Sequence, residues 1–154
     1  ATTEIYTLSL HDALPILNRN NLFYICSLLE SISRKTGLKK KEIIDKIGLK
    51  QLKHLYNYAD VNHCLPILQV TEEVIENNHL PVKEIGTSQT VSVWDNGKVY
   101  QRLIIDISDD SNWFDKLIEV YHSWICDYLD NTELPIYWQP RSYIRECYLE
   151  KKIL

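Results

Sequence analysis

Apolar residues recur three and four positions apart along most of the chain, and this helical period restricts the fold more than any other feature. From residue 20 to residue 78 the period is interrupted at Gly37 and Gly48, residues typical of helix C-termini, and at Pro66, which suits a first helical turn. The pattern predicts four helices, over residues 20–36, 39–47, 49–59 and 66–78. Their expected buried positions are Leu22, Ile25, Cys26, Leu29, Ile32, Ile43, Ile44, Ile47, Leu49, Leu52, Leu55, Tyr56, Ala59, Ile67, Val70, Val74 and Ile75.

The helical pattern continues toward the C-terminus. Residues 111–131 are predicted to form one long core helix, and a last helix is predicted to begin at Pro140. The side chains expected to face the core from these two helices are Trp113, Leu117, Val120, Tyr121, Trp124, Tyr128, Tyr143, Ile144, Cys147 and Tyr148.

The stretch before these helices allows two structures. Asn96-Gly97 is a strong signal for a hairpin turn. Val99, Leu103 and Ile107 lie on one helical face, however, and Asp95 is a candidate helix cap. We favour the helix, and a short β-hairpin near residues 90–100 remains the alternative.

These patterns predict an all-α protein, a small multi-helix bundle. We expect residues 17–85 to form an N-terminal helical bundle and residues 86–154 to form an aromatic-rich helical subdomain packed on it. Residues 17–154 are enough for such a pair of packed subdomains around a sizeable core.

Cysteine usage and hydropathy indicate the compartment. The four cysteines are widely spaced among apolar or aromatic neighbours, which favours reduced, buried thiols over a disulfide framework. No apolar run approaches the roughly 20 residues needed to cross a bilayer. We therefore expect a cytoplasmic protein without a membrane partner. The cysteines are Cys26, Cys64, Cys126 and Cys147.

The first sixteen residues, ATTEIYTLSLHDALPI, have a different origin in our interpretation. The forward adapter of a common short-read sequencing platform encodes the same order of residues, and the chain contains no Met. The stretch resembles translated adapter joined to a gene fragment, so we expect residues 1–16 to add nothing to the core or to function. His11-Asp12 is then a chance pair rather than a metal or acid–base site.

Charge is distributed unevenly. Residues 34–54 contain eight lysine or arginine residues and two acidic residues, whereas residues 55–154 contain eight basic and 16 acidic residues. Such asymmetry is typical of a basic contact patch for an acidic partner, or of a solvated helix face. The candidate basic patch consists of Lys39, Lys40, Lys41, Lys46, Lys50 and Lys53.

A pair of basic helices also allows DNA binding as a helix-turn-helix. Residues 39–47 would support a recognition helix formed by residues 50–58. Two positions depart from that motif, because Ile44 stands where Ala is usual and His54 stands where an apolar residue is usual. A protein partner is therefore favoured over nucleic acid.

Asp60 and His63, beside Cys64, form a candidate polar site. Their spacing is compatible with an imidazole oriented for acid–base work or with two metal ligands. No H-E-x-x-H or C-x-x-C motif accompanies them. The favoured interpretation is structural: Asp60 caps the turn into the next helix, and His63 satisfies a buried backbone group. We expect no catalytic residue, bound metal or cofactor.

The run LPIYWQPRSY is the first choice for a contact surface. Tyr and Trp are frequent at protein interfaces because they combine a large apolar area with a polar tip. The candidate interface residues are Tyr137, Trp138, Arg141 and Arg145. A platform for stacking nucleic-acid bases is the weaker alternative, because the surrounding half of the chain is acidic.

The first half also has a familiar order of segments. A helix similar to NLFYICSLLESISRKTGL precedes KKKEIIDKI, an Asp60-Val61-Asn62-His63 element and a helix ending in NNHLP. Over about residues 20–80 this order resembles a family of small helical bacterial proteins of the Firmicutes type, which carry Y-D-V-L-H-T at the turn. Ala59 and Cys64 replace the Tyr and the Thr here. The resemblance implies a partner-binding role near toxin-like genes on mobile elements, and it assigns no catalytic residues.

Together these features favour a cytoplasmic helical protein that binds another protein without catalysis, as an antitoxin or accessory module with a toxin-like partner. Two alternatives stay open. One is nucleic-acid binding through the basic patch, and the other is an enzyme or metal site at Asp60 and His63.

Overall fold

The computed structural model describes residues 15–83 and 91–154. Within these ranges the chain forms nine α-helices, one 3₁₀ helix and no strand, so the all-α prediction is confirmed. The first five helices are α2 (Arg19–Thr36), α3 (Lys40–Ile47), α4 (Leu49–Asn57), α5 (Ala59–Asn62) and α6 (Ile67–Asn77). The others are α7 (Val93–Ile107), α8 (Trp113–Tyr121), α9 (Cys126–Leu129), η1 (Pro135–Trp138) and α10 (Arg141–Glu150).

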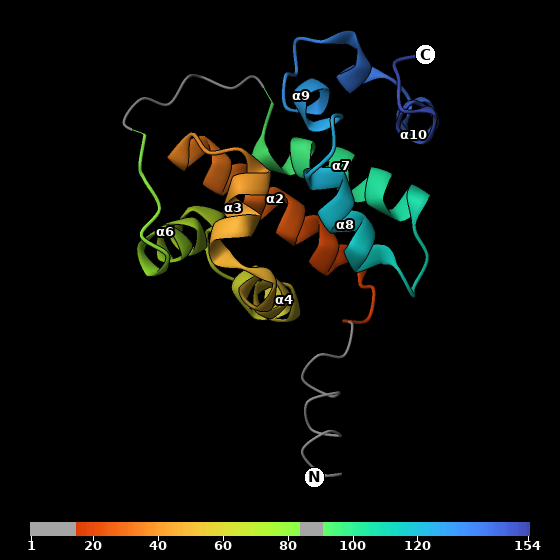
Figure 1. The fold of residues 1–154 in the computed structure, drawn as a ribbon. Helices are drawn as coiled ribbons and strands as arrows, with labels where there is room; N and C mark the ends of the chain where they lie inside the picture. Colours follow the sequence, from red (N-terminus) through yellow and green to blue (C-terminus); the bar gives the residue numbers. More distant parts are fainter. Residues whose placement is uncertain (1–14, 84–90) are drawn as a thin grey trace.

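Helix α2 lies at the centre of the bundle, with α3, α4, α6 and α7 around it (Figure 1). It begins where the Asn18 side chain accepts a hydrogen bond of 3.0 Å from the backbone N–H of Asn21. It ends at Gly37, whose φ of 74° is the left-handed conformation that glycine adopts without strain. Since α2 contacts helices from both halves of the chain, their apolar residues form one continuous core.

The Asn96-Gly97 pair lies inside α7 rather than in a hairpin turn. Helix α7 makes its most extensive contact with α2, and Gly97 lies close to Ser27 of α2. A Cβ atom at residue 97 would lie only 2.7 Å from the backbone nitrogen of Ser27. Glycine is therefore required here for helix packing.

The cap of α7 differs from the prediction. Ser92, not Asp95, is the N-cap, and its hydroxyl accepts a hydrogen bond of 3.0 Å from the backbone N–H of Asp95. Asp95 instead lies in the first turn, where its negative charge interacts favourably with the helix dipole.

The predicted long helix over residues 111–131 is wrong, because the chain turns between Tyr121 and Cys126. Ser123 donates from both its backbone N–H and its hydroxyl to the carbonyl of Val120, and such local bonds compete with helix continuation. The turn leaves Ile125 and Leu129 fully buried.

Most of the predicted core positions are buried, and the exceptions lie at helix ends and in turns. Leu49 begins α4 and is 48% exposed, Tyr128 in the short helix α9 is 38% exposed, and Cys64 follows α5 in an exposed turn. The partly buried exceptions are Ile67, Trp124, Tyr143, Tyr148 and Cys126.

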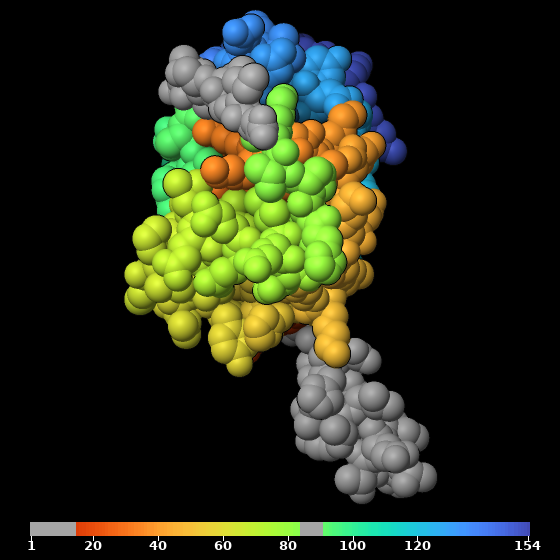
Figure 2. Space-filling model, turned by 90° about the vertical axis from the view of Figure 1, so that its left-hand side faces the viewer, coloured from red at the N-terminus to blue at the C-terminus, as the bar shows by residue number. Residues whose placement is uncertain are grey.

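Figure 2 shows the face formed by α5 and α6, in yellow to green, turned toward the viewer, with the last part of the chain, in blue, at the top.

Residues 1–14, and with them most of the adapter-like stretch and His11-Asp12, lie outside the described residues, as does the expected boundary between residues 85 and 86. The last two residues of the stretch contact the bundle through their backbone. The carbonyl of Pro15 accepts a hydrogen bond of 2.9 Å from the indole N–H of Trp113, and that of Ile16 accepts one of 2.6 Å from the hydroxyl of Tyr56. These contacts do not depend on the side chains at residues 15 and 16.

Across the two described ranges, no helix combines the length and the apolar composition that a membrane span requires.

We predict that Gly97→Ala destabilises the protein although alanine is the better helix former by about 1 kcal/mol. The added Cβ would meet backbone atoms of Ser27, so α2 and α7 must move apart, at a cost of about 1–3 kcal/mol. Urea denaturation measures the change, with Ser142→Ala at an exposed position of α10 as the control. A raised unfolding midpoint for Gly97→Ala would contradict the close approach.

Candidate functional site

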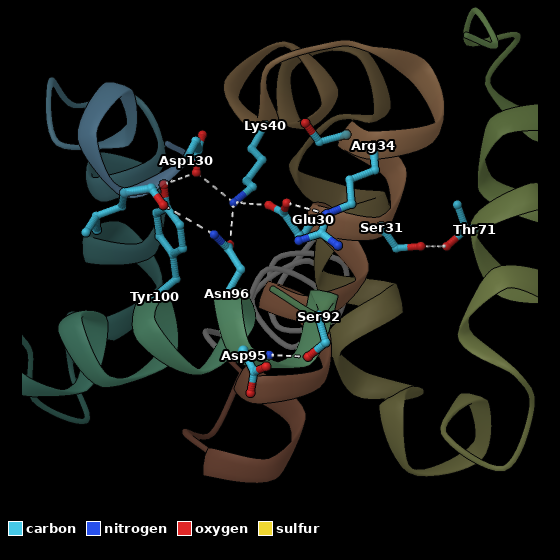
Figure 3. Close-up of polar contacts among 12 residues, drawn as sticks. Glu30, Ser31, Arg34, Lys40, Thr71, Ser92, Asp95, Asn96, Tyr100 and Asp130 are labelled. Atoms are coloured by element: carbon cyan, nitrogen blue, oxygen red, sulfur yellow. Dashed lines mark hydrogen bonds and ion pairs between the residues drawn. The ribbon is translucent and has the colours of Figure 1, made fainter. Parts of the chain in front are cut away.

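The ammonium of Lys40 lies inside the bundle, since the Lys40 side chain is only 1% exposed. Its Nζ donates to Glu30 Oε2 at 2.6 Å, to Asp130 Oδ1 at 2.9 Å and to Asn96 Oδ1 at 2.8 Å. Figure 3 shows these partners converging on Lys40 from α2, α7 and the end of α9. The three N–H donors of the ammonium are thus all used.

Further contacts complete this Lys40 cluster, which we define as Lys40, Glu30, Asp130, Asn96, Arg34 and Tyr100. Arg34 donates to Glu30 Oε1 at 2.8 Å, and the hydroxyl of Tyr100 donates to Asp130 at 2.5 Å. The ammonium also lies 4.1 Å from the centre of the Tyr100 ring, a cation–π distance. Two positive and two negative charges balance one another within the cluster.

The charges hold one another in the ionised form. Burial by itself lowers the pKa of Lys40, but Glu30 and Asp130 outweigh it and hold that pKa above its usual value. Burial by itself raises the pKa of Glu30, but Lys40 and then Arg34 outweigh it and hold that pKa below its usual value. The cluster therefore stabilises the fold fully at pH values between the unfolded-state pKa of Glu, about 4.3, and that of Lys, about 10.4. This stability is lost as Glu30 gains a proton in acid or as Lys40 loses one in base.

The burial of Lys40 corrects the predicted basic patch, since Lys40 is not accessible to a partner. The signal for this was present in the sequence, because residues 40, 43, 44 and 47 are spaced to share one helical face and the other three are isoleucines. Lys53 is partly buried, and its ammonium lies 5.2 Å from the centre of the Phe114 ring. The exposed members are Lys39, Lys41, Lys46 and Lys50.

Asp60 and His63 are exposed at the ends of the short helix α5. The imidazole Nδ1 of His63 lies 2.6 Å from the carbonyl oxygen of Asp60, so the pair is joined through the backbone and not through the carboxylate. The expected cap is absent from α6, where Pro66 holds the N-cap position without a side-chain bond. His63 does satisfy a backbone carbonyl as predicted, but an exposed one.

No set of three or more His, Cys, Asp or Glu side chains in residues 15–83 and 91–154 is placed to hold a metal ion. The four cysteines are free thiols, and burial raises the pKa of Cys26 to about 12.

Three of the four predicted interface residues line one cavity of about 490 Å³ between α7, η1 and α10, which we call the aromatic groove. Tyr137 is buried, while Trp138 beside it is 66% exposed. Arg141 also lines the groove and binds both carboxylate oxygens of Asp106, at 2.5 and 2.8 Å. Arg145 lies outside the groove and pairs with Glu146 at 2.9 Å.

Helix α7 adds two basic residues to the aromatic groove that the sequence analysis did not single out, Lys98 and Arg102. These two residues line the groove because of the way α7 packs against η1 and α10, and no local sequence pattern predicts that packing. The cluster residues Asn96 and Asp130 were missed for the same reason: their partners lie 56 and 90 positions away along the chain.

No known protein family, curated protein or solved structure matches this chain.

We predict that Lys40→Met destabilises the protein by about 3–5 kcal/mol, because it leaves Glu30 and Asp130 without their buried counter-charge. The neighbouring exposed Lys41→Met is the matched control and should change stability by less than about 0.5 kcal/mol. Denaturant titrations of both variants measure the difference. Equal stability of the two variants would mean that the cluster does not hold the helices together.

Proposed function

We propose that this protein is a non-enzymatic binding module that docks another protein in the aromatic groove. We further propose that it acts in the cytoplasm, where its four free thiols would stay reduced, and that its partner is toxin-like, with this chain as antitoxin or accessory factor.

The observation that carries the proposal is the fixed position of an exposed tryptophan. The indole N–H of Trp138 donates to the carbonyl of Thr132 at 2.8 Å, and its ring stands edge-on to Tyr137 at 5.1 Å between centres. An aromatic side chain that is already ordered loses little entropy when a partner covers it, which favours its use as an anchor.

The charges around Trp138 indicate the kind of partner. Lys98 and Arg102 line the aromatic groove, and neither forms an ion pair with a carboxylate in the part of the chain that the structure describes. Asp95 is the one acidic side chain among the groove's described lining residues. A partner segment with an apolar side chain flanked by acidic residues would match this arrangement.

The two other functions have weaker support. Nucleic-acid binding would use the exposed members of the basic patch, Lys39, Lys41, Lys46 and Lys50, without Lys40. Catalysis or metal binding at Asp60 and His63 lacks a contact between the carboxylate and the imidazole.

We predict that Arg102→Glu reduces capture of the native partner from the host at least tenfold, because it reverses an exposed charge in the aromatic groove. Lys50→Glu makes the same charge change on α4 and should leave capture unchanged. Quantitative pull-down with the full chain, followed by identification of the captured protein, is the measurement. Trp138→Ala should also lose the partner.

The proposal fails if Lys50→Glu abolishes binding while Arg102→Glu retains it, since the basic patch would then be the contact surface. It also fails if the chain turns over a small molecule and the reaction is lost in His63→Ala.

A further inference from the structure

A second cavity, of about 450 Å³, lies among α2, α5 and the start of α7. Asp60 and His63 line it from α5, while Phe23 and Tyr24 line it from α2 and Trp94 from α7. The exposed polar pair recognised in the sequence thus faces an aromatic wall built from two distant segments. We call this cavity the aromatic pocket; it shares no described lining residue with the aromatic groove.

Two aromatic rings, those of Phe23 and Tyr24, lie next to the ring of Trp94 in the aromatic pocket. The ring centres of Phe23 and Trp94 are 5.6 Å apart with an interplanar angle of 59°, and those of Tyr24 and Trp94 are 6.3 Å apart at 49°. The rings are therefore inclined to one another rather than stacked. Trp94 is 40% exposed, so this wall is open to a ligand and not sealed into the core.

The polar groups of the aromatic pocket favour a positive ligand. Asp60 and His63 line it, and no lysine or arginine does so among the described residues. Tyr24 is only 4% exposed, yet its hydroxyl has no hydrogen-bond partner in the described structure. Phe23 already contacts a cation, since the ammonium of Lys98 lies 5.0 Å from the centre of its ring.

We propose that the aromatic pocket binds an organic cation, specifically a quaternary ammonium group, against the aromatic wall formed by Phe23, Tyr24 and Trp94 and near Asp60. Ring faces attract a cation through their quadrupole, and a group of several aromatic rings is the usual receptor for methylated ammonium ions.

An alkylated ammonium suits the aromatic pocket better than a primary ammonium. A primary ammonium carries three N–H donors and would need an acceptor for each. Asp60 is the one carboxylate among the pocket's described lining residues, which also include Asn20, Asn21 and His63. A quaternary ammonium has no donor and exposes only methyl groups. An anion would lie against the carboxylate of Asp60 and against the negative faces of the rings.

The first experiment compares choline with its neutral isostere, 3,3-dimethylbutan-1-ol, by calorimetry and tryptophan fluorescence on the full chain. The two probes share shape and hydroxyl and differ in charge. Choline should bind roughly tenfold more tightly, as expected for a partly desolvated cation–π contact. Equal affinity would overturn the proposal, because the pocket would then recognise apolar volume alone.

Variants locate the binding and separate it from the proposed groove. Trp94→Ala should abolish choline binding, whereas Trp138→Ala removes an exposed indole elsewhere and should retain it. Asp60→Asn keeps the shape of the side chain, carries no risk to the core, and should weaken choline severalfold. Retention of wild-type affinity by Trp94→Ala or by Asp60→Asn would overturn the proposal.

The ammonium of Lys98, next to Phe23, allows a test of the sign of the ligand's charge. Lys98→Gln removes a like charge close to the pocket and should tighten choline binding, and weaker binding in this variant would contradict a cation site.

A peptide with trimethyllysine, run beside choline, identifies the source of the quaternary ammonium. Tighter binding of choline supports the proposal with a free small molecule as the ligand, and tighter binding of the peptide supports it with a methylated lysine side chain as the ligand. Failure of both probes to bind would overturn it.

Discussion

The structure depends on one buried charge, the ammonium of Lys40. An ammonium inside a protein is stable only when its donors are satisfied and its charge is balanced. Lys40 on α3 meets both conditions with Glu30 from α2, Asn96 from α7 and Asp130 from the end of α9. Four segments must reach their native positions together before the charge is accommodated. Exchanging a whole buried ion cluster for apolar residues is often neutral in stability, so we interpret this one as fixing geometry.

The Lys40 cluster holds the start of α7 in place, and this segment carries residues of both proposed sites. Asn96 accepts from Lys40 and donates to the carbonyl of Leu129, while Gly97 allows α7 to lie against α2. Trp94 precedes these two residues and lines the aromatic pocket, and Lys98 follows them and lines the aromatic groove. Residues of both proposed sites thus lie beside the same turn of α7, which the Lys40 cluster and the contact of Gly97 with α2 hold in place.

The sequence predicted those features that depend on the local apolar period and on glycine at a helix C-terminus. The buried face of α2 and its end at Gly37 follow from spacing and from glycine chemistry, and both are confirmed. The break after Tyr121 was not predictable, because the apolar period continues through it while local bonds of Ser123 end the helix. Asn96-Gly97 was ambiguous since the same dipeptide suits a turn and a close helix contact. Lys40 was assigned to a surface by its charge, although its position on the isoleucine face indicated burial.

The central claim is that Lys40 stays charged inside the bundle, and carbon-13 NMR titration of the lysine side chains tests it most directly. Comparison with Lys40→Arg assigns the resonance of the Lys40 ε-carbon. Burial lowers the pKa of Lys40, but its carboxylate partners outweigh burial and raise that pKa above the usual value for lysine, so this carbon should keep its protonated shift above a pH of about 10.4. Titration of Lys40 at or below a pH of about 10.4, the unperturbed value for lysine, would contradict a charged ammonium as the constraint that organises the fold.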